Sequence, residues 1–372
     1  TTAPVAGGIL EDMPRLDYSG SCPSLKLEPQ RTNLVEYSEY FDGWEKQNVS
    51  NTANITTSPE GFVNAYTIAD NATNSRHINY LNLNGDLSVS RTFSIYAKQN
   101  TLRYLFLSVT GSSDAHCYSA IFDLQDGVVS GTKTNGAATL TESIENVGNG
   151  WYRCIISGTM TTATANYFPL IGTSDRPDFT GSLFNNNAPS YAGDGSSIYI
   201  YGAQLEQDAT YPTSYIPTNG TSQTRLEDSP TASNVASLIG QTEGTLFMDC
   251  DNLNFSSDVM SFFPQAGSVY GSGILIFLTS NDLRFFLFAN STNSIFTTSF
   301  VNGGRNKIAM TYTSTAINAY VNGVKVGTST SAAFPQTLNQ IRLGSAQALN
   351  PNKDVNQTII FPTALSDDEC IE

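Results

Sequence analysis

Acidic, histidine and cysteine side chains are the groups in this 372-residue chain that could carry acid–base, nucleophilic or metal chemistry. The chain has only two histidines, His77 and His116. A polysaccharide lyase uses a Tyr/His pair with Arg or Lys around it, and the one hint of this is Arg76 beside His77. In a strand those two side chains would point to opposite faces.

Carboxylates spaced for glycoside hydrolysis are missing as well. The pattern Glu-x-Asp-x-x-Glu would set both carboxylates on one strand face, about 5–5.5 Å apart, and it does not occur. Gly-x-Ser-x-Gly, His-Glu-x-x-His and the P-loop pattern are absent too. The sequence therefore predicts a protein that is not an enzyme.

The five cysteines contain no Cys-x-x-Cys pair, and with two histidines a His/Cys zinc site is not expected. An odd number of cysteines without close spacing is typical of buried free thiols rather than of a disulfide framework. The cysteines are Cys22, Cys117, Cys154, Cys250 and Cys370.

The composition is acidic, weakly charged and rich in aromatic residues. The formal net charge is −15, which disfavours binding to nucleic acid or to an anionic membrane surface. Charged residues make up 14% of the chain, against about 25% in typical proteins. The longest apolar run, 274–278, is far short of the roughly 18 residues that span a bilayer, so no membrane insertion is expected. Because the chain begins at Thr1, we expect a processed or truncated piece.

Hydrophobic side chains alternate with a period of two, for example in 92–97, 197–201 and 318–326. Asn-Gly or Asp-Gly pairs recur between such stretches, and both residue types tolerate the positive φ of two-residue hairpin turns. The best helical candidate is 366–370. This pattern predicts an all-β fold of two tandem antiparallel β-sandwiches (jelly rolls) with an extended N-terminal segment.

Composition shifts predict four segments. Prolines prevent a helix in 1–30, which is expected to be extended. A first sandwich is predicted over 31–218, a linker rich in Pro, Thr, Ser and Asn over 219–235, and a second sandwich over 236–372.

The first block contains five characteristic stretches, which are PRLDYSGSCPSLKLEPQRTNLVEYSEYFDGW (14–44), RTFSIYAKQ (91–99), AIFDLQDGVV (120–129), ENVGNGWYRC (145–154) and IYIYGAQLEQDATYPTSYIPTNGTSQTR (198–225). These stretches resemble a family that is common in tail-fibre and other structural proteins of bacteriophages. Their order and spacing are similar to those of a jelly roll like the carbohydrate-binding modules. In the second block, 305–327, 341–345 and 359–370 resemble a concanavalin A-like or laminin-G-like sandwich.

The resemblance to a carbohydrate-binding module directs attention to aromatic side chains, on which sugar rings stack. Tyr199 and Tyr201 are two residues apart and share a strand face, so they form a candidate platform of two rings. Trp44 and Tyr37 complete the candidate ligand-binding set. The alternatives are that the tyrosines merely cover a sheet face and that Trp44, like Trp151, packs in the core.

The two resemblances also imply a metal site and a cysteine pairing. Jelly rolls of this kind often hold a structural calcium ion near the chain ends of the fold, where Glu36, Glu206 and Asp208 are the candidate ligands. In laminin-G-like sandwiches the first and last strands are neighbours. If one disulfide exists, we therefore expect it between Cys250 and Cys370.

These observations together predict a non-catalytic structural or adhesion protein of a phage virion, a fibre or spike component on the particle surface. Its expected partners are host-surface glycans, other virion proteins and further copies of itself, as a trimer. The alternatives are a purely architectural head-decoration or tail-assembly protein, a secreted glycan-binding protein of a bacterium, and a polysaccharide-degrading enzyme.

Overall fold

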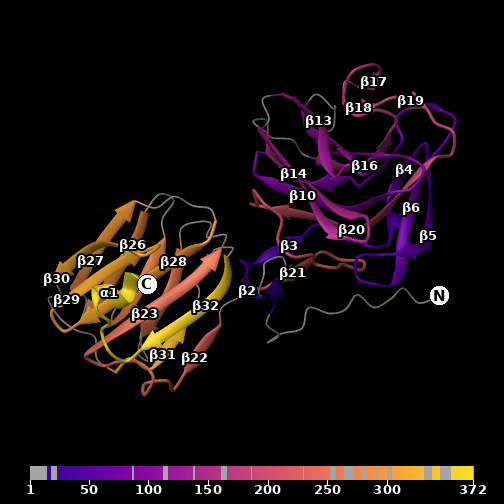
Figure 1. Cartoon of the computed structure of the whole chain (residues 1–372). Helices are drawn as coiled ribbons and strands as arrows, with labels where there is room; N and C mark the ends of the chain where they lie inside the picture. Colours follow the sequence, from indigo (N-terminus) through magenta and orange to yellow (C-terminus); the bar gives the residue numbers. More distant parts are fainter. Residues whose placement is uncertain are drawn as a thin grey trace. The chain divides into compact units, whose positions relative to one another are not determined.

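The computed structural model describes most of the chain, and strands dominate it (Figure 1), which confirms the predicted all-β class. In the described part of the chain, no helix is long and apolar enough to cross a membrane. The described residues are 15–17, 23–85, 88–111, 116–136, 139–160, 166–185, 187–228, 230–251, 257–263, 272–278, 282–289, 292–299, 304–330, 337–343 and 353–371.

The chain forms two compact units, and the second is built from two segments that are far apart in the sequence. The first contains Arg31–Arg225, and the second combines Leu226–Glu372 with Leu10–Gln30. The expected linker is not a plain connector, because it contributes the short strands β21 (Gln223–Arg225) to the first unit and β22 (Thr231–Ser233) to the second.

The first unit is built from two large antiparallel sheets, here named sheet I and sheet II. Sheet I consists of β14 (Thr139–Gly148), β15 (Trp151–Thr159), β10 (Arg91–Gln99), β20 (Ser197–Gln207), β3 (Arg31–Asn33) and β21, with β6 (Val63–Asp70) on β20 and β5 (Val49–Thr57) on β6. Sheet II consists of β13 (Val128–Asn135), β12 (Cys117–Asp123), β11 (Tyr104–Gly111), β16 (Asn166–Ser174), β8 (Ile78–Tyr80) and β4 (Glu45–Gln47), with β9 (Leu83–Asn84) on β16. Smaller elements are η1 (Phe41–Gly43) and the strand pairs β17 (Leu183–Phe184) with β18 (Ala188–Pro189) and β19 (Tyr191–Ala192) with β7 (Asn74–Ser75).

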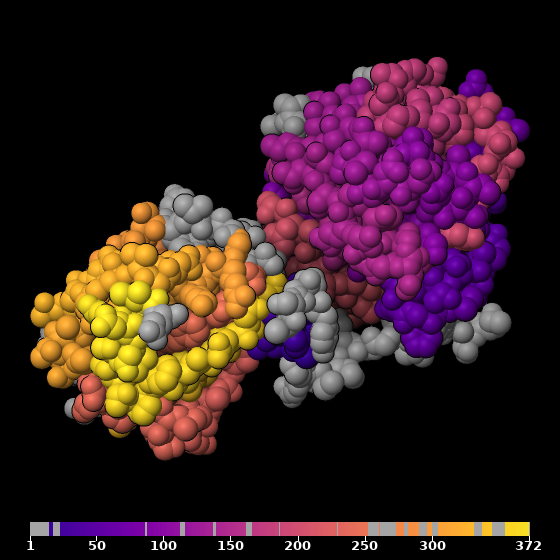
Figure 2. Space-filling model, viewed as in Figure 1, coloured from indigo at the N-terminus to yellow at the C-terminus, as the bar shows by residue number. Residues whose placement is uncertain are grey.

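The second unit also contains two large antiparallel sheets, here named sheet III and sheet IV. Sheet III has the order β1 (Leu16–Asp17), β2 (Ser24–Leu27), β32 (Lys353–Phe361), β23 (Glu243–Asp251), β28 (Asn306–Thr313), β29 (Ala316–Val321) and β30 (Val324–Thr330). Sheet IV has the order β22, β31 (Gln340–Arg342), β24 (Ser257–Phe263), β25 (Ser272–Leu278), β26 (Asp282–Ala289) and β27 (Thr292–Ser299). The helix α1 (Asp367–Ile371) follows β32, and the C-terminal residues appear in yellow on the surface of this unit in Figure 2.

The strand period of two separates a core face from an outer face in each unit. In β10, Phe93, Ile95 and Ala97 point into the core between sheets I and II, so the residues between them point outward. In β23, Leu246 and Met248 lie in the core of the second unit, which leaves the odd-numbered residues of that strand on the outer face of sheet III.

Local sequence signals explain the turns and the helix. Asn322 and Gly323 have φ angles of 51° and 76° and join β29 to β30, as a two-residue turn of type I′ requires. At α1, Ser366 Oγ accepts a hydrogen bond from the Glu369 N–H at 3.4 Å, and Glu369 Oε2 accepts one from the Ser366 N–H at 2.8 Å. This reciprocal capping confirms the helix predicted at 366–370.

The first and last long strands of the second sandwich, β23 and β32, are neighbours, as the laminin-G-like resemblance implies. The N-terminal segment adds a feature that was not predicted: β2 pairs with the other side of β32. Arg15 forms ion pairs with Glu28 and Asp228, while the Glu28 N–H donates to Asp228 Oδ2 at 2.8 Å. These contacts join the point where the chain leaves the second unit to the point where it returns.

Candidate binding site

The outer face of sheet I carries two rows of large side chains that run across β15, β10 and β20. In one row Tyr96 lies opposite Arg153 on one side and Tyr201 on the other. In the next row Lys98 lies opposite Trp151 and Tyr199. Directly opposed residues in an antiparallel sheet have Cβ atoms about 4.5–5.5 Å apart, so each row is a continuous strip of contacts.

Three tyrosine rings pack together at the end of the first row. The ring centroids of Tyr96 and Tyr201 are 6.2 Å apart, and Tyr215 lies 6.0 Å from Tyr96 and 5.9 Å from Tyr201. Gly202 lies under this group with φ +62°, and a Cβ there would come within 3.1 Å of the Tyr96 ring and 3.2 Å of the Tyr215 ring. Glycine is therefore needed both for the backbone angle and for the approach of the rings.

A hairpin covers one side of this face. The buried indole of Trp151 donates from Nε1 to the Thr57 carbonyl oxygen at 3.0 Å, at the end of β5. The connection to β6 follows directly, and Phe62 at its end and Val63 at the start of β6 are 68% and 61% exposed. Exposed apolar residues at a single hairpin tip provide a contact surface beside the tyrosines.

Two carboxylates approach the tyrosines, Glu39 from the segment before η1 and Glu60 from the hairpin tip. Tyr215 Oη donates to Glu39 Oε1 at 3.0 Å and to Ser38 Oγ at 2.7 Å. The Tyr201 hydroxyl is buried, and among the described residues it has no hydrogen-bond partner of normal geometry. Glu39, Glu60, Tyr96, Tyr201 and Tyr215 together are called the tyrosine–carboxylate cluster below.

The charges of this cluster perturb one another. Burial, followed by the charge of Glu60, raises the pKa of Glu39 above its ordinary value. Burial also raises the pKa of Tyr201, and the negative charges of Glu39 and Glu60 raise it further. Tyr201 therefore stays a neutral hydroxyl that can donate a hydrogen bond, while the two carboxylates accept them.

We expect the substitution Glu39→Gln to change how stability depends on pH. Because folding raises the pKa of Glu39, the protonated form is favoured in the native state, and this contribution is lost as pH rises through the folded pKa. The glutamine is neutral at every pH and keeps an oxygen that accepts from Tyr215. We therefore expect the difference in free energy of unfolding between the variant and the wild type to shift in favour of the variant between pH 4 and pH 7. Urea midpoints at the two pH values measure this effect. Glu142→Gln, on the exposed strand β14, is the control, and an equal response in both variants would contradict the prediction.

The aromatic residues predicted as ligand contacts differ in how far they are exposed. Tyr199 and Tyr201 do share the outer face of sheet I, but Tyr201 is 1% exposed, so the two rings do not form an open platform. Trp44 is buried in the core, where its Nε1 donates to the Tyr37 carbonyl oxygen at 3.0 Å. Tyr37 is half-buried and packs edge-on against the exposed Tyr40, with ring centroids 5.8 Å apart.

The three candidate calcium ligands, Glu36, Glu206 and Asp208, do not form a metal-binding group. The buried carboxylate of Glu206 accepts hydrogen bonds from the Thr213 N–H at 3.0 Å and from its hydroxyl at 2.5 Å. Glu36 and Asp208 are exposed. Within the described ranges, no three His, Cys, Asp or Glu side chains are grouped so that they could hold a metal ion.

His77 and four of the five cysteines lie in the described part of the chain. His77 is buried, and its two ring nitrogens lie 2.8 Å from the Asn48 carbonyl oxygen and 3.0 Å from that of Tyr191. Cys250 and Cys370 are free thiols, because Cys250 points into the core while Cys370 lies on the outer face of the same sheet. Cys117 and Cys154 are buried free thiols as predicted, and Cys22 lies outside the described residues.

Sequence reasoning missed four members of the tyrosine–carboxylate cluster: Glu39, Glu60, Tyr96 and Tyr215. Tyr96 could have been found, because it lies in a strand whose alternation was recognised. The other three lie outside the strands of sheet I, and only the folded chain brings them to one place.

No protein-family model matches the sequence, and no curated protein sequence is similar to it. Solved structures with weak similarity include the binding domain of botulinum neurotoxin DC in complex with SialylT, with a TM-score of 0.33, 14% identity and coverage of 38% of each chain. Another is a CBM40 domain of the Ruminococcus gnavus IT-sialidase bound to α2,3-sialyllactose, with a TM-score of 0.32, 15% identity and coverage of 37% of this chain and 84% of that one. The chain thus spans well under half of the neurotoxin chain. Scores at this level supply no argument about the function of the present chain.

Proposed function

We propose that this chain is a non-catalytic carbohydrate-binding protein and that a glycan contacts the tyrosine–carboxylate cluster on sheet I together with the Tyr199 ring in the next row. The observation that carries the proposal is the meeting of half-exposed rings and two carboxylates on one face, around the buried Tyr201 hydroxyl. Sugars offer C–H faces that pack on aromatic rings and hydroxyl groups that donate to carboxylates. Half-exposed Tyr96 and Tyr199 supply the rings, and Glu39 and Glu60 supply the acceptors.

The finer proposal is that the protein belongs to a phage particle, as a fibre or spike component that attaches to host-surface glycans. Its support is the resemblance of the stretches within 14–225 to phage structural proteins, together with the acidic, weakly charged composition. Other virion proteins and a trimeric assembly are part of this proposal. Electron microscopy of the particle with an antibody to the chain tests it: label at distal tips supports attachment, and label confined to the shell supports the architectural alternative.

A glycan array with the intact chain tests carbohydrate binding. We expect binding to a subset of glycans and a loss of about tenfold or more in affinity in Tyr199→Ala, because a stacked ring contributes on the order of 1.4 kcal/mol or more to such contacts. Tyr104→Ala changes a half-buried tyrosine on sheet II and is the matched control. Absence of binding to every glycan, or equal binding by both variants, would rule out this site.

A polysaccharide-degrading enzyme is the second candidate, and one observation favours it. Glu39 has a raised pKa and lies near a second carboxylate, Glu60, and glycosidases perform acid–base chemistry with a pair of carboxyl groups. Release of reducing ends from a bound polysaccharide, abolished in both Glu39→Gln and Glu60→Gln, would favour the enzyme over the binding protein.

A further inference from the structure

A groove of about 470 Å³ lies on the outer face of sheet III in the second unit, and none of the residues that line it belongs to the tyrosine–carboxylate cluster. Strand pairing sets its floor in two rows. In one row Phe247 lies opposite Ala309 and Ile359, and Ala309 in turn lies opposite Tyr320. In the next row Asp249 lies opposite Lys307 and Gln357.

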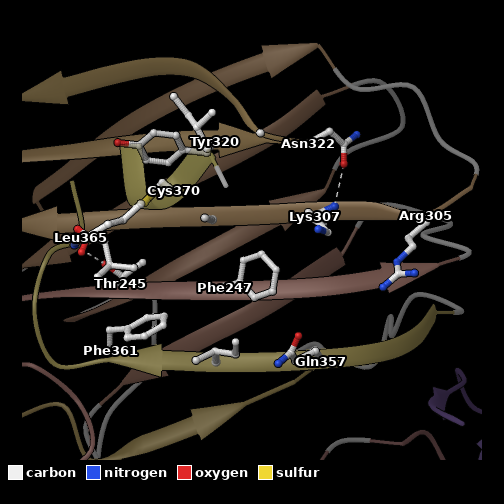
Figure 3. Close-up of a pocket in the computed structure, with 15 residues that line it drawn as sticks. Thr245, Phe247, Arg305, Lys307, Tyr320, Asn322, Gln357, Phe361, Leu365 and Cys370 are labelled. Atoms are coloured by element: carbon white, nitrogen blue, oxygen red, sulfur yellow. Dashed lines mark hydrogen bonds between the residues drawn. The ribbon is translucent and has the colours of Figure 1, made fainter. Parts of the chain in front are cut away.

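The two rows give the groove an apolar half and a polar half. Figure 3 shows Phe247 in the middle of the floor, with Tyr320, Cys370, Leu365 and Phe361 on one side of it. The helix α1 closes this apolar side, since Glu369, Cys370 and Ile371 also line the groove. On the other side of Phe247 lie Asn322, Lys307, Arg305 and Gln357, all of which carry hydrogen-bond donors.

Among its described residues, the polar half of the groove has more positive than negative charge, because Arg305 and Lys307 face the single carboxylate of Asp249. Arg305 donates two hydrogen bonds to the buried carboxylate of Asp249, at 2.8 and 2.6 Å, and its own side chain is 60% exposed. These bonds, followed by the positive charges of Arg305 and Lys307, keep the pKa of Asp249 below its usual range. The exposed Lys307 ammonium group makes no hydrogen bond or ion pair with a described residue. One positive charge of the polar half is therefore uncompensated, in a chain whose net charge is −15.

We propose that this groove binds an acidic sugar, with its anionic group at Lys307 and its ring over Phe247. A neutral sugar or a purely apolar ligand would leave the Lys307 charge unused, and an inorganic anion would leave the aromatic floor uncovered. Carboxylate and sulfate groups both satisfy the chemistry of the polar half, and Asn322 and Gln357 can donate to the ring hydroxyls or the anionic group. Pockets that bury small ligands measure about 300–1,000 Å³, so a groove of this size holds one or two sugar residues.

This inference rests on the proposed carbohydrate-binding function and adds a second, charge-selective site. It is tested by calorimetric titration of the intact chain with a galacturonic acid trisaccharide and with the neutral galactose trisaccharide of the same linkage. We expect the wild type to bind the acidic sugar about tenfold more tightly, and Lys307→Gln to remove that advantage without changing affinity for the neutral sugar. The advantage also shrinks as the salt concentration rises, because the pair is exposed. Arg284→Gln removes a half-buried cation, 3.9 Å from Asp282, from sheet IV and is the control for the loss of a positive charge elsewhere in the same unit.

The outcomes separate this inference from the proposed function. Acidic-sugar binding that is lost in Lys307→Gln and Phe247→Ala but unchanged in Tyr199→Ala supports the groove. Equal affinity for the two sugars, or no effect of Lys307→Gln, overturns the acidic-sugar site while the proposed function stands. Conversely, if Tyr199→Ala and Glu39→Gln leave the binding of every glycan unchanged, including the neutral trisaccharide, while acidic-sugar binding depends on Lys307, the groove is supported and the site on sheet I is removed.

Discussion

The substitution Asn33→Asp is expected to destabilise the first unit by about 3–5 kcal/mol, the usual cost of an uncompensated buried charge. Asn33 is fully buried, and its amide group makes four hydrogen bonds. Nδ2 donates to the carbonyl oxygens of Ala203 at 3.1 Å and Ile216 at 2.8 Å. Oδ1 accepts from the N–H groups of Val35 at 3.1 Å and Leu205 at 3.0 Å.

The aspartate would keep the shape of the side chain but lose both donors. Two buried carbonyl oxygens would then face a carboxylate, and protonation of that carboxylate restores only one donor. Chemical denaturation followed by intrinsic fluorescence should show an earlier transition, because Trp44 and Trp151 both lie in this unit. Asn146→Asp is the control, since Asn146 is exposed and uses only its oxygen, to accept from the Gly148 N–H at 2.9 Å. Equal stability of the two variants would show that the Asn33 donors are not needed.

The second large effect is expected for Trp151→Ala, which should cost about 3–5 kcal/mol, as large aromatic deletions in packed sites do. Trp151 is 1% exposed and packs with Ala65 and Tyr201 on the outer face of sheet I. Its loss leaves a cavity beside the tyrosines and frees the Thr57 carbonyl oxygen, so the β5–β6 hairpin loses its attachment.

Hydrogen exchange measures the local part of this effect. In Trp151→Ala, amide protection should fall in β5 and β6 more than in sheet II. Trp151→Phe is the informative control, because it fills most of the space but cannot donate to Thr57. Its smaller loss should still be concentrated in the hairpin. A uniform decrease across both sheets in the phenylalanine variant would argue that the indole N–H does not hold the hairpin.

Much of the fold was predictable because it follows from local patterns. Alternation identified the strands that became β10, β20, β29 and β30, and Asn322-Gly323 fixed the register of the hairpin that joins the last two. The short helix at the end of the chain followed from Ser366 and the acidic residues after it. Each of these signals lies within about ten residues of sequence.

The sites were only partly predictable, because burial depends on distant segments. Alternation correctly put Tyr199 and Tyr201 on one face, but Tyr215 packs against Tyr201 from a loop that no periodicity describes. In the same way, alternation alone predicts that Phe247 lies on the opposite strand face from Leu246 and Met248. The groove around Phe247, with α1 at one end, could not be predicted. It depends on the pairing of β23 with β28 and β32, whose partner residues are more than fifty positions apart in sequence.

The pairing of β2 with β32 has a consequence for how the nascent chain reaches its final form. Residues 24–27 leave the ribosome early, but their partner residues 353–355 are synthesised more than three hundred positions later. The first unit is therefore a complete domain inserted between the two parts of the second, and it can fold while the N-terminal strand still waits for its partner. A fragment that begins at residue 226 would expose one edge of β32 that β2 occupies in the intact chain, and such an unpaired edge promotes self-association.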